Sequence, residues 1–140
     1  MASEAPSDQL QRALDEALQY AMISSIDFAL KRELLDLGAN PETSYALVAA
    51  ASRCSVDDLE LILGTTVDPN QRYQGRHVGE AALACFDREG GAEDIEAVAL
   101  VSLLYRAGSD LCSYAADPAI TTPGTRDVLR EAGICADRLR

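Results

Sequence analysis

The sequence predicts an all-α fold in which helix–turn–helix units stack into a solenoid with short projecting turns. The first observation is an internal repeat. The segment LLDLGAN at 34–40 recurs in altered form as LILGTTVDPN at 61–70 and LLYRAGSD at 103–110. Two alanine-rich segments, 45–51 and 79–85, are a second repeated pair, offset by 34 residues. Self-similarity at such a period is typical of stacked helical hairpins.

The repeated unit contains an alanine-rich helix, a polar break, a leucine-rich helix and a turn. This order resembles the ankyrin repeat, which has a period of about 33 residues and often ends in Leu-Leu-x-x-Gly-Ala-Asp-x-Asn. The resemblance covers most of residues 20–134 in about four units and implies an ankyrin-like fold that binds proteins on its concave face. No unit contains the Thr-Pro-Leu-His tetrad of that family, and His77 lies outside its position. Tetratricopeptide-like or other helical-hairpin solenoids are therefore the alternative fold.

We expect a flexible N-terminus over 1–7 and one ankyrin-repeat-like domain over 8–140. Its units are expected at about 8–40, 41–70, 71–110 and 111–140. Apolar spacing and turn residues predict helices over 8–37 with a break near 24–25, then 43–52, 56–63, 80–86, 95–107 and 123–133. Extra residues at 87–94 separate the helices of the third unit.

Three local signals set helix ends. Gly38 is expected to end the first pair in a left-handed conformation. Ser55 is expected to cap the following helix, with Asp58 completing a pair like a capping box. Thr122 and Pro123 have the cap-then-proline order that begins a helix.

The charge balance limits the class of partner. The net charge is −11 and the pI is near 4.4, so the surface should repel nucleic-acid phosphates and anionic membranes. A basic or neutral protein is the more natural partner. No apolar run reaches the ~18 residues of a membrane span, and the first residues lack the pattern of a secretory signal. These features predict an intracellular protein, cytoplasmic or nuclear.

Four cysteines lie at positions 54, 85, 112 and 135, in spacings that match no zinc site and no CxxC redox pair. We therefore expect buried thiols in a reducing compartment, with disulfides or a reactive thiol as the less favoured alternatives. Neither a metal nor a cofactor is expected.

Catalytic patterns are sparse, which predicts that the chain is not an enzyme. A dyad of Cys85 and His77 is disfavoured because a small-residue helix position buries the thiol and makes it inert. An unrecognised acidic site at Glu89, Glu93 and Asp94 is the enzymatic alternative.

The segment 70–77 is locally basic and contains an aromatic residue in an otherwise acidic chain. Its place in the ankyrin-like pattern implies a projecting turn between the second and third units. Tyrosine and arginine are frequent at the energetic centres of interfaces. The predicted partner-binding residues are Arg72, Tyr73, Arg76 and His77, with Tyr45 at the start of the neighbouring helix.

The alternative for these residues is structural. The arginines would then pair with Asp68 or Glu80, and Tyr45 would pack on the turn at Pro41.

Together these observations predict a non-enzymatic protein-interaction module, acting as an adaptor, an inhibitor or a subunit of a complex. A structural subunit that self-assembles is one alternative, since a truncated last unit would leave an apolar edge exposed. An enzyme with an unrecognised acidic site is the other.

Overall fold

The computed structural model describes residues 6–24, 27–87 and 95–139. Within these ranges the chain is mostly helical, and its strands form one small antiparallel hairpin. The elements are α1 (Pro6–Ile23), α2 (Phe28–Asp36), α3 (Ala46–Ser52), α4 (Val56–Leu63), β1 (Arg72–Tyr73), β2 (Arg76–His77), α5 (Val78–Leu83), the 3-10 helix η1 (Ala84–Asp87), α6 (Ile95–Arg106), α7 (Cys112–Ala115) and α8 (Pro123–Glu131). The predicted all-α class is confirmed.

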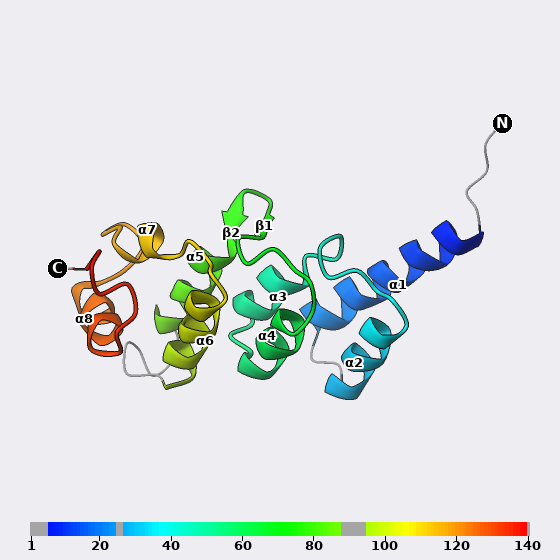
Figure 1. Cartoon of the computed structure of the whole chain (residues 1–140), viewed down its shortest axis with the longest axis horizontal. Coiled ribbons are helices and arrows are strands. Elements are labelled where there is room, and N and C mark those ends of the chain that lie inside the picture. The colour runs from blue at the N-terminus through cyan, green and yellow to red at the C-terminus, as the bar shows by residue number, and fades with distance from the viewer. Residues whose placement is uncertain (1–5, 25–26, 88–94, 140) are drawn as a thin grey trace.

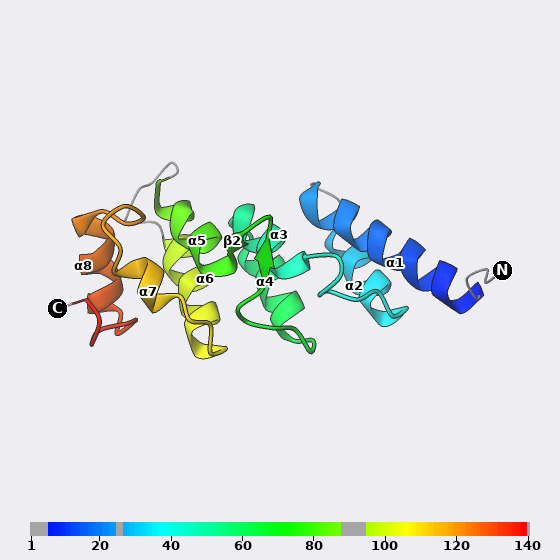
Figure 2. The ribbon, with the colours of Figure 1, turned by 90° about the horizontal axis from the view of Figure 1, so that it is seen from above.

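The helices lie in a row along the long axis of the molecule, from α1 at one end to α8 at the other (Figures 1 and 2). Helices α1, α3, α5 and α7 contact one another in succession. Helix α2 packs on α1, α4 on α3, and α6 on both α5 and α4. The β1–β2 hairpin projects from one side of the row, between α3 and α5 (Figure 1).

Small side chains let neighbouring helices approach closely. Helices α3 and α5 pack against each other, and both contain fully buried alanines, among them Ala46, Ala50 and Ala82. At Gly79 in α5, an added Cβ atom would lie 2.7 Å from Cβ of Leu111, next to α7. A side chain at this position would therefore push α5 and α7 apart.

Most predicted helix boundaries agree with the structure to within three residues. Helix α4 matches the predicted 56–63, and α6 ends one residue before the predicted end. Gly38 has the expected positive φ of 106°. The Oγ1 atom of Thr122 accepts the Thr125 N–H at 3.1 Å, and Pro123 opens α8.

The structure departs from the prediction at four helices. Helix α1 begins at Pro6, inside the segment predicted to be flexible, and residues 1–5 lie outside the described part of the chain. Helix α3 begins three residues later than predicted, because residues 41–45 form turns. Helix α5 begins two residues earlier, and the short helix α7 was not predicted. The extra residues at 88–94 also lie outside the described part.

The expectation of free thiols is wrong, because all four cysteines form disulfides. One bond joins Cys54, between α3 and α4, to Cys85 in η1. The other joins Cys112 in α7 to Cys135, after α8. Each bond links two successive parts of the row. Sequence separations of 31 and 23 residues do not reveal this proximity, since it arises from the stacking of the helices.

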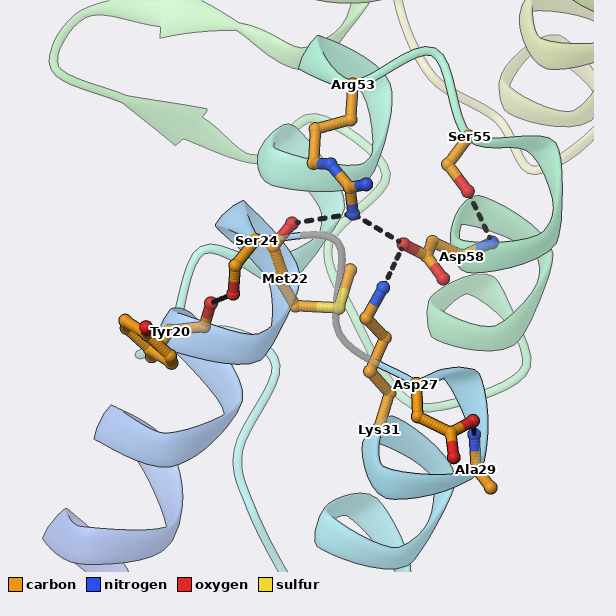
Figure 3. A network of polar contacts seen from close by, with 9 residues as sticks. All are labelled: Tyr20, Met22, Ser24, Asp27, Ala29, Lys31, Arg53, Ser55 and Asp58. Carbon is orange, nitrogen blue, oxygen red and sulfur yellow. Dashed lines mark hydrogen bonds and ion pairs between the residues drawn. The ribbon is translucent and has the colours of Figure 1, made fainter.

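A buried ion pair joins α2 to α4. Lys31, the single lysine of the chain, places Nζ 2.7 Å from Oδ2 of Asp58, and both side chains are almost completely buried (Figure 3). Arg53 Nη1 lies 3.4 Å from the same oxygen and 3.4 Å from the carbonyl oxygen of Met22. Ser55 caps α4 by accepting the Asp58 N–H, as predicted. The predicted capping-box role of Asp58 is wrong, because the Ser55 N–H donates to the Ala50 carbonyl oxygen at 3.1 Å and the Asp58 carboxylate pairs with the two basic side chains.

Candidate functional site

The segment 70–77, predicted to be a projecting turn, contains a tight β-hairpin. Strands β1 and β2 pair in antiparallel register, with Arg72 opposite His77 and Tyr73 opposite Arg76. The two loop residues, Gln74 and Gly75, both have positive φ, at 52° and 80°. Positive φ at both central positions is the signature of a type I′ turn, whose twist matches that of the flanking strands.

Gln71 fixes the base of the hairpin against the preceding helix. Its side chain is buried, and Oε1 accepts the N–H groups of Leu47 and Val48 at 3.1 Å each. Its Nε2 donates to the carbonyl oxygen of Pro41 at 3.1 Å. The N-cap residue of α3, Tyr45, makes no capping hydrogen bond of its own. Gln71 therefore caps α3 from a distant part of the chain and ties the hairpin to it.

Asn70 and His77 fix the other side of the hairpin. Oδ1 of Asn70 accepts the Asp110 N–H at 2.7 Å and lies 3.0 Å from Nε2 of His77. Nδ1 of His77 accepts the Gly79 N–H at 2.8 Å, and Glu80 completes a capping box at the start of α5. The hairpin is thus held to α3 on one side and to α5 and the α6–α7 connection on the other.

His77 is a structural residue rather than a contact for a partner. Its side chain is only 2% exposed, and its ring stacks on Tyr114 at a centroid distance of 4.7 Å. Burial, and then the nearby charge of Arg72, lower the pKa of His77 below its ordinary value of 6.5. The ring is therefore neutral at pH 7. Because Nδ1 accepts the Gly79 N–H, the proton is on Nε2, which donates to Oδ1 of Asn70. The prediction that His77 binds a partner is therefore wrong, because a partner cannot reach its buried side chain.

The two arginines of the hairpin differ in their surroundings. Arg72 donates through Nη2 to the Tyr114 hydroxyl at 2.6 Å and through Nη1 to the Gly75 carbonyl oxygen at 3.3 Å. The structural alternative paired this side chain with Asp68 or Glu80, and neither pair forms; Arg72 instead contacts an uncharged hydroxyl and a backbone carbonyl. Arg76 is exposed, and within the described residues its side chain makes no hydrogen bond or ion pair. Arg76 therefore remains accessible at the hairpin.

Beside the hairpin lies an apolar cleft of about 310 Å³ between the end of α1, the start of α3 and β1. Tyr45 and Tyr73 form one wall, with their ring centroids 4.7 Å apart. Val48 and Ala49 line the cleft from α3, and Ile23 lines it from α1. Ile23 is 63% exposed and Tyr45 is 39% exposed. Both predicted tyrosines therefore meet at one accessible apolar surface. We call this hollow the apolar cleft.

A second hollow adjoins the apolar cleft along α1. It measures about 350 Å³, and its lining includes Asp8, Asp15 and Glu16 with the single cation Arg12. Gln19 lines both hollows, so they meet at this residue of the helix. We call the second hollow the acidic pocket.

Other hollows on the described residues are more polar. One of about 420 Å³ lies between α2 and α4, and charged side chains line it together with Phe28 and Leu61. Within residues 6–24, 27–87 and 95–139, no group of three or more His, Cys, Asp or Glu side chains is arranged to hold a metal ion. The acids Glu89, Glu93 and Asp94 of the enzymatic alternative lie outside these ranges.

Sequence reasoning missed Ile23 and Gln19 as members of the site. The only available signal was the helical position of Ile23, which follows the buried Leu18 and Met22 but does not lie on their face. The helical position predicts that the Ile23 side chain is exposed, but it does not predict which other elements lie beside that side chain. The packing of α1 on α3 decides which part of α1 lies beside the hairpin.

Comparison with known proteins adds no relative. No protein-family model, curated protein or solved structure matches this chain.

Proposed function

We propose that this chain is a non-enzymatic protein-binding module with an ankyrin-like stack of helical pairs. It binds a protein partner on the face formed by α1, α3 and the hairpin, as an adaptor, an inhibitor or a subunit of a complex. The observation that supports this most directly is the exposed Ile23 beside the Tyr45–Tyr73 ring pair at the apolar cleft. Accessible aromatic and aliphatic side chains around a hollow are the usual anchors of a protein interface.

The rigidity of this surface favours the same function. The hairpin is fixed to the elements on both sides by buried hydrogen bonds of Gln71 and His77 and by an exposed one from the Asp110 N–H to Asn70. A surface that is already ordered loses little conformational entropy on binding, so more of the contact energy contributes to affinity.

The partner is expected to be basic or neutral, because the chain has a net charge of −11. Nucleic acid and anionic membrane are disfavoured by the same charge. None of the described helices is long and apolar enough to cross a bilayer.

The two disulfides bear on the cellular location of the protein. The intracellular location expected from the sequence stays a prediction. The two disulfides weigh against a reducing cytoplasm, because glutathione and thioredoxin keep most cytosolic thiols reduced. An oxidising compartment is therefore the location that we favour.

The proposal is tested with a cleft variant and a control variant matched for exposure. The cleft variant is Ile23→Ala with Tyr45→Asn, since asparagine tolerates the positive φ of 53° at position 45. The control is Leu37→Ala with Tyr105→Ala, which removes side chains that are 62% and 40% exposed elsewhere.

Partners captured from the native lysate with wild-type protein are purified, and their affinities for the three forms are compared. We expect a partner that binds wild type and control alike, and binds the cleft variant at least about tenfold more weakly. Thermal melts must show that all three forms are folded. If every captured protein binds the cleft variant as tightly as wild type, the cleft is not the site. An Arg76→Ala variant separately tests the exposed arginine of the hairpin.

A self-assembling subunit is the second candidate function. Leu129, Ile134 and Leu139 are buried at the C-terminal end of the row, so the apolar edge expected there is covered. The opposite end has exposed apolar side chains instead, including Leu10 at 61% and Leu37 at 62%. Sedimentation velocity over a range of concentrations tests this: a purely monomeric chain would eliminate self-assembly.

A further inference from the structure

The apolar cleft and the acidic pocket lie along one face of α1. Glu16 lines the acidic pocket, Gln19 lines both hollows, and Ile23 lines the apolar cleft. Positions i, i+3 and i+7 share a helix face, and seven residues of helix rise about 10 Å. An extended chain covers this distance with about three residues. A single short segment can therefore occupy both hollows.

The acidic pocket has an excess of negative charge. Three acids and one cation, Arg12, are among its lining residues. Asp15 accepts hydrogen bonds from Gln11 Nε2 at 2.8 Å, the Asn40 N–H at 2.6 Å and the Thr43 hydroxyl at 2.6 Å. These donors are all neutral, so they hold the carboxylate in place without cancelling its charge.

The apolar cleft supplies the complementary part of the site. Its tyrosine wall and Ile23 offer apolar surface to one large side chain. An apolar anchor beside an unbalanced negative charge fits a segment that combines a large apolar residue with a basic one. A second copy of this chain is a poor fit, because two copies of a protein with net charge −11 repel each other.

We propose that the apolar cleft and the acidic pocket together bind one basic segment of a partner protein. A large aliphatic or aromatic side chain of that segment fills the cleft, and a lysine or arginine about three residues away lies over Glu16. The proposal rests on the proposed function, since it names the chemistry of the partner at the same site.

The probe is a phage-displayed library of random peptides of about twelve residues, which is long enough to span both hollows. The library is selected on wild-type protein with intact disulfides, and binders are sorted by their loss of binding to the cleft variant. Enriched peptides are then synthesised with a fluorescent label for affinity measurements.

Two charge variants show whether the affinity of the selected peptides depends on the acidic pocket. The pocket variant is Asp8→Asn with Glu16→Gln; it spares Asp15, which holds the chain near residues 40–43. The matched control is Asp57→Asn with Glu60→Gln. It also removes one aspartate and one glutamate charge, but from exposed positions of α4. In both pairs the aspartate lies in the first turn of its helix, so the effects on helix stability are similar.

We expect cleft-dependent peptides with a large apolar residue and a lysine or arginine about three positions away. The pocket variant should bind them about three- to tenfold more weakly, and the control about as well as wild type. Raising NaCl from about 0.05 to 0.5 M should weaken wild-type binding and reduce the difference between the variants.

The contrary outcomes are distinguishable. Cleft-dependent peptides that are neutral or acidic, or that bind the pocket variant as tightly as wild type, would overturn this inference and leave the proposed function standing. A selection with no cleft-dependent peptide would contradict both. A wild-type dimer that the cleft variant abolishes would show that a second copy occupies the site, which also overturns the basic segment.

Discussion

Lys31 and Asp58 form an ion pair of 2.7 Å between α2 and α4, and each side chain is about 4% exposed (Figure 3). The pair lies where two successive helical pairs meet. Removing two charges from water is costly, and their mutual attraction offsets most of that cost. If one partner is removed, the other charge stays buried without compensation. The pair therefore specifies how α2 docks on α4 more than it adds net stability.

Replacing Lys31 with methionine should destabilise the protein. The variant keeps the apolar stem but leaves Asp58 buried with only Arg53, at 3.4 Å. We expect the free energy of unfolding to fall by about 3 kcal/mol, the low end for a broken buried pair, because Arg53 remains. Urea denaturation measures this change.

The control is Arg32→Met, which changes an exposed residue next to Lys31 on α2. It should lower the urea midpoint of unfolding by much less. A double variant, Lys31→Met with Asp58→Leu, should regain part of the stability, since neither charge then remains buried. Equal midpoints for Lys31→Met and Arg32→Met would contradict the importance of the pair.

Gln71→Ala should also destabilise the protein, through the N-terminus of α3. The substitution removes the acceptor of the Leu47 and Val48 N–H groups, which lie in a buried part of the helix. A lost cap and unsatisfied buried donors together cost about 2 kcal/mol. Gln9→Ala, at an exposed position of α1, is the matched control and should be near neutral. Hydrogen exchange at residues 47 and 48 should speed up more in Gln71→Ala than elsewhere in α3; uniform protection would argue against this cap.

Local signals allowed much of the fold to be predicted. Ser55 and Thr122 each cap a helix by accepting an N–H three residues later, so the sequence near each helix contained the necessary information. The start of α3 could not be predicted this way. Its cap is Gln71, more than twenty residues further along the chain, while Tyr45 has the left-handed φ of 53°.

The site was predicted only in part, because local sequence signals do not show which residues meet across different helices. Residue type alone drew attention to Tyr45 and Tyr73, and the structure brings their rings together. The same reasoning selected His77, whose burial depends on Tyr114 packing from a different unit. Ile23 was missed because no local pattern shows which residues face across a stack of helices.

Reducing the two disulfides should lower stability without changing the order of the helices. The bonds close loops with sequence separations of 31 and 23 residues. By the loop-entropy relation each contributes about 3.5 kcal/mol, mainly by restricting the unfolded chain. Urea denaturation with and without dithiothreitol should show this loss.

Thiol titration in denaturant checks the bonds directly. The protein purified without reductant should contain no free thiol, and it should show four after reduction. The variant Cys112→Ala with Cys135→Ala should retain only the first bond and lose about half of the dithiothreitol-dependent stability. Four titratable thiols in the unreduced protein would disprove both pairings.

His77 should make the protein less stable in mild acid. Burial and Arg72 lower its pKa in the folded state below the ordinary 6.5, so the unfolded chain binds the proton more tightly. Stability therefore rises with pH between the folded and unfolded pKa values; on acidification the loss begins near pH 6.5 and is complete below the folded pKa. Protonation would also remove the acceptor that Nδ1 presents to the Gly79 N–H.

Because the chain has one histidine, its ring signals in an NMR titration belong to His77 without ambiguity. They should give a midpoint below 6.5 in the folded protein. His77→Asn is the control, since asparagine can cap α5 but does not titrate in this range. Its urea midpoint should fall less than that of wild type between about pH 7.5 and 5. A folded-state midpoint above 6.5 would mean that folding favours the protonated ring, and would reverse the expected pH dependence.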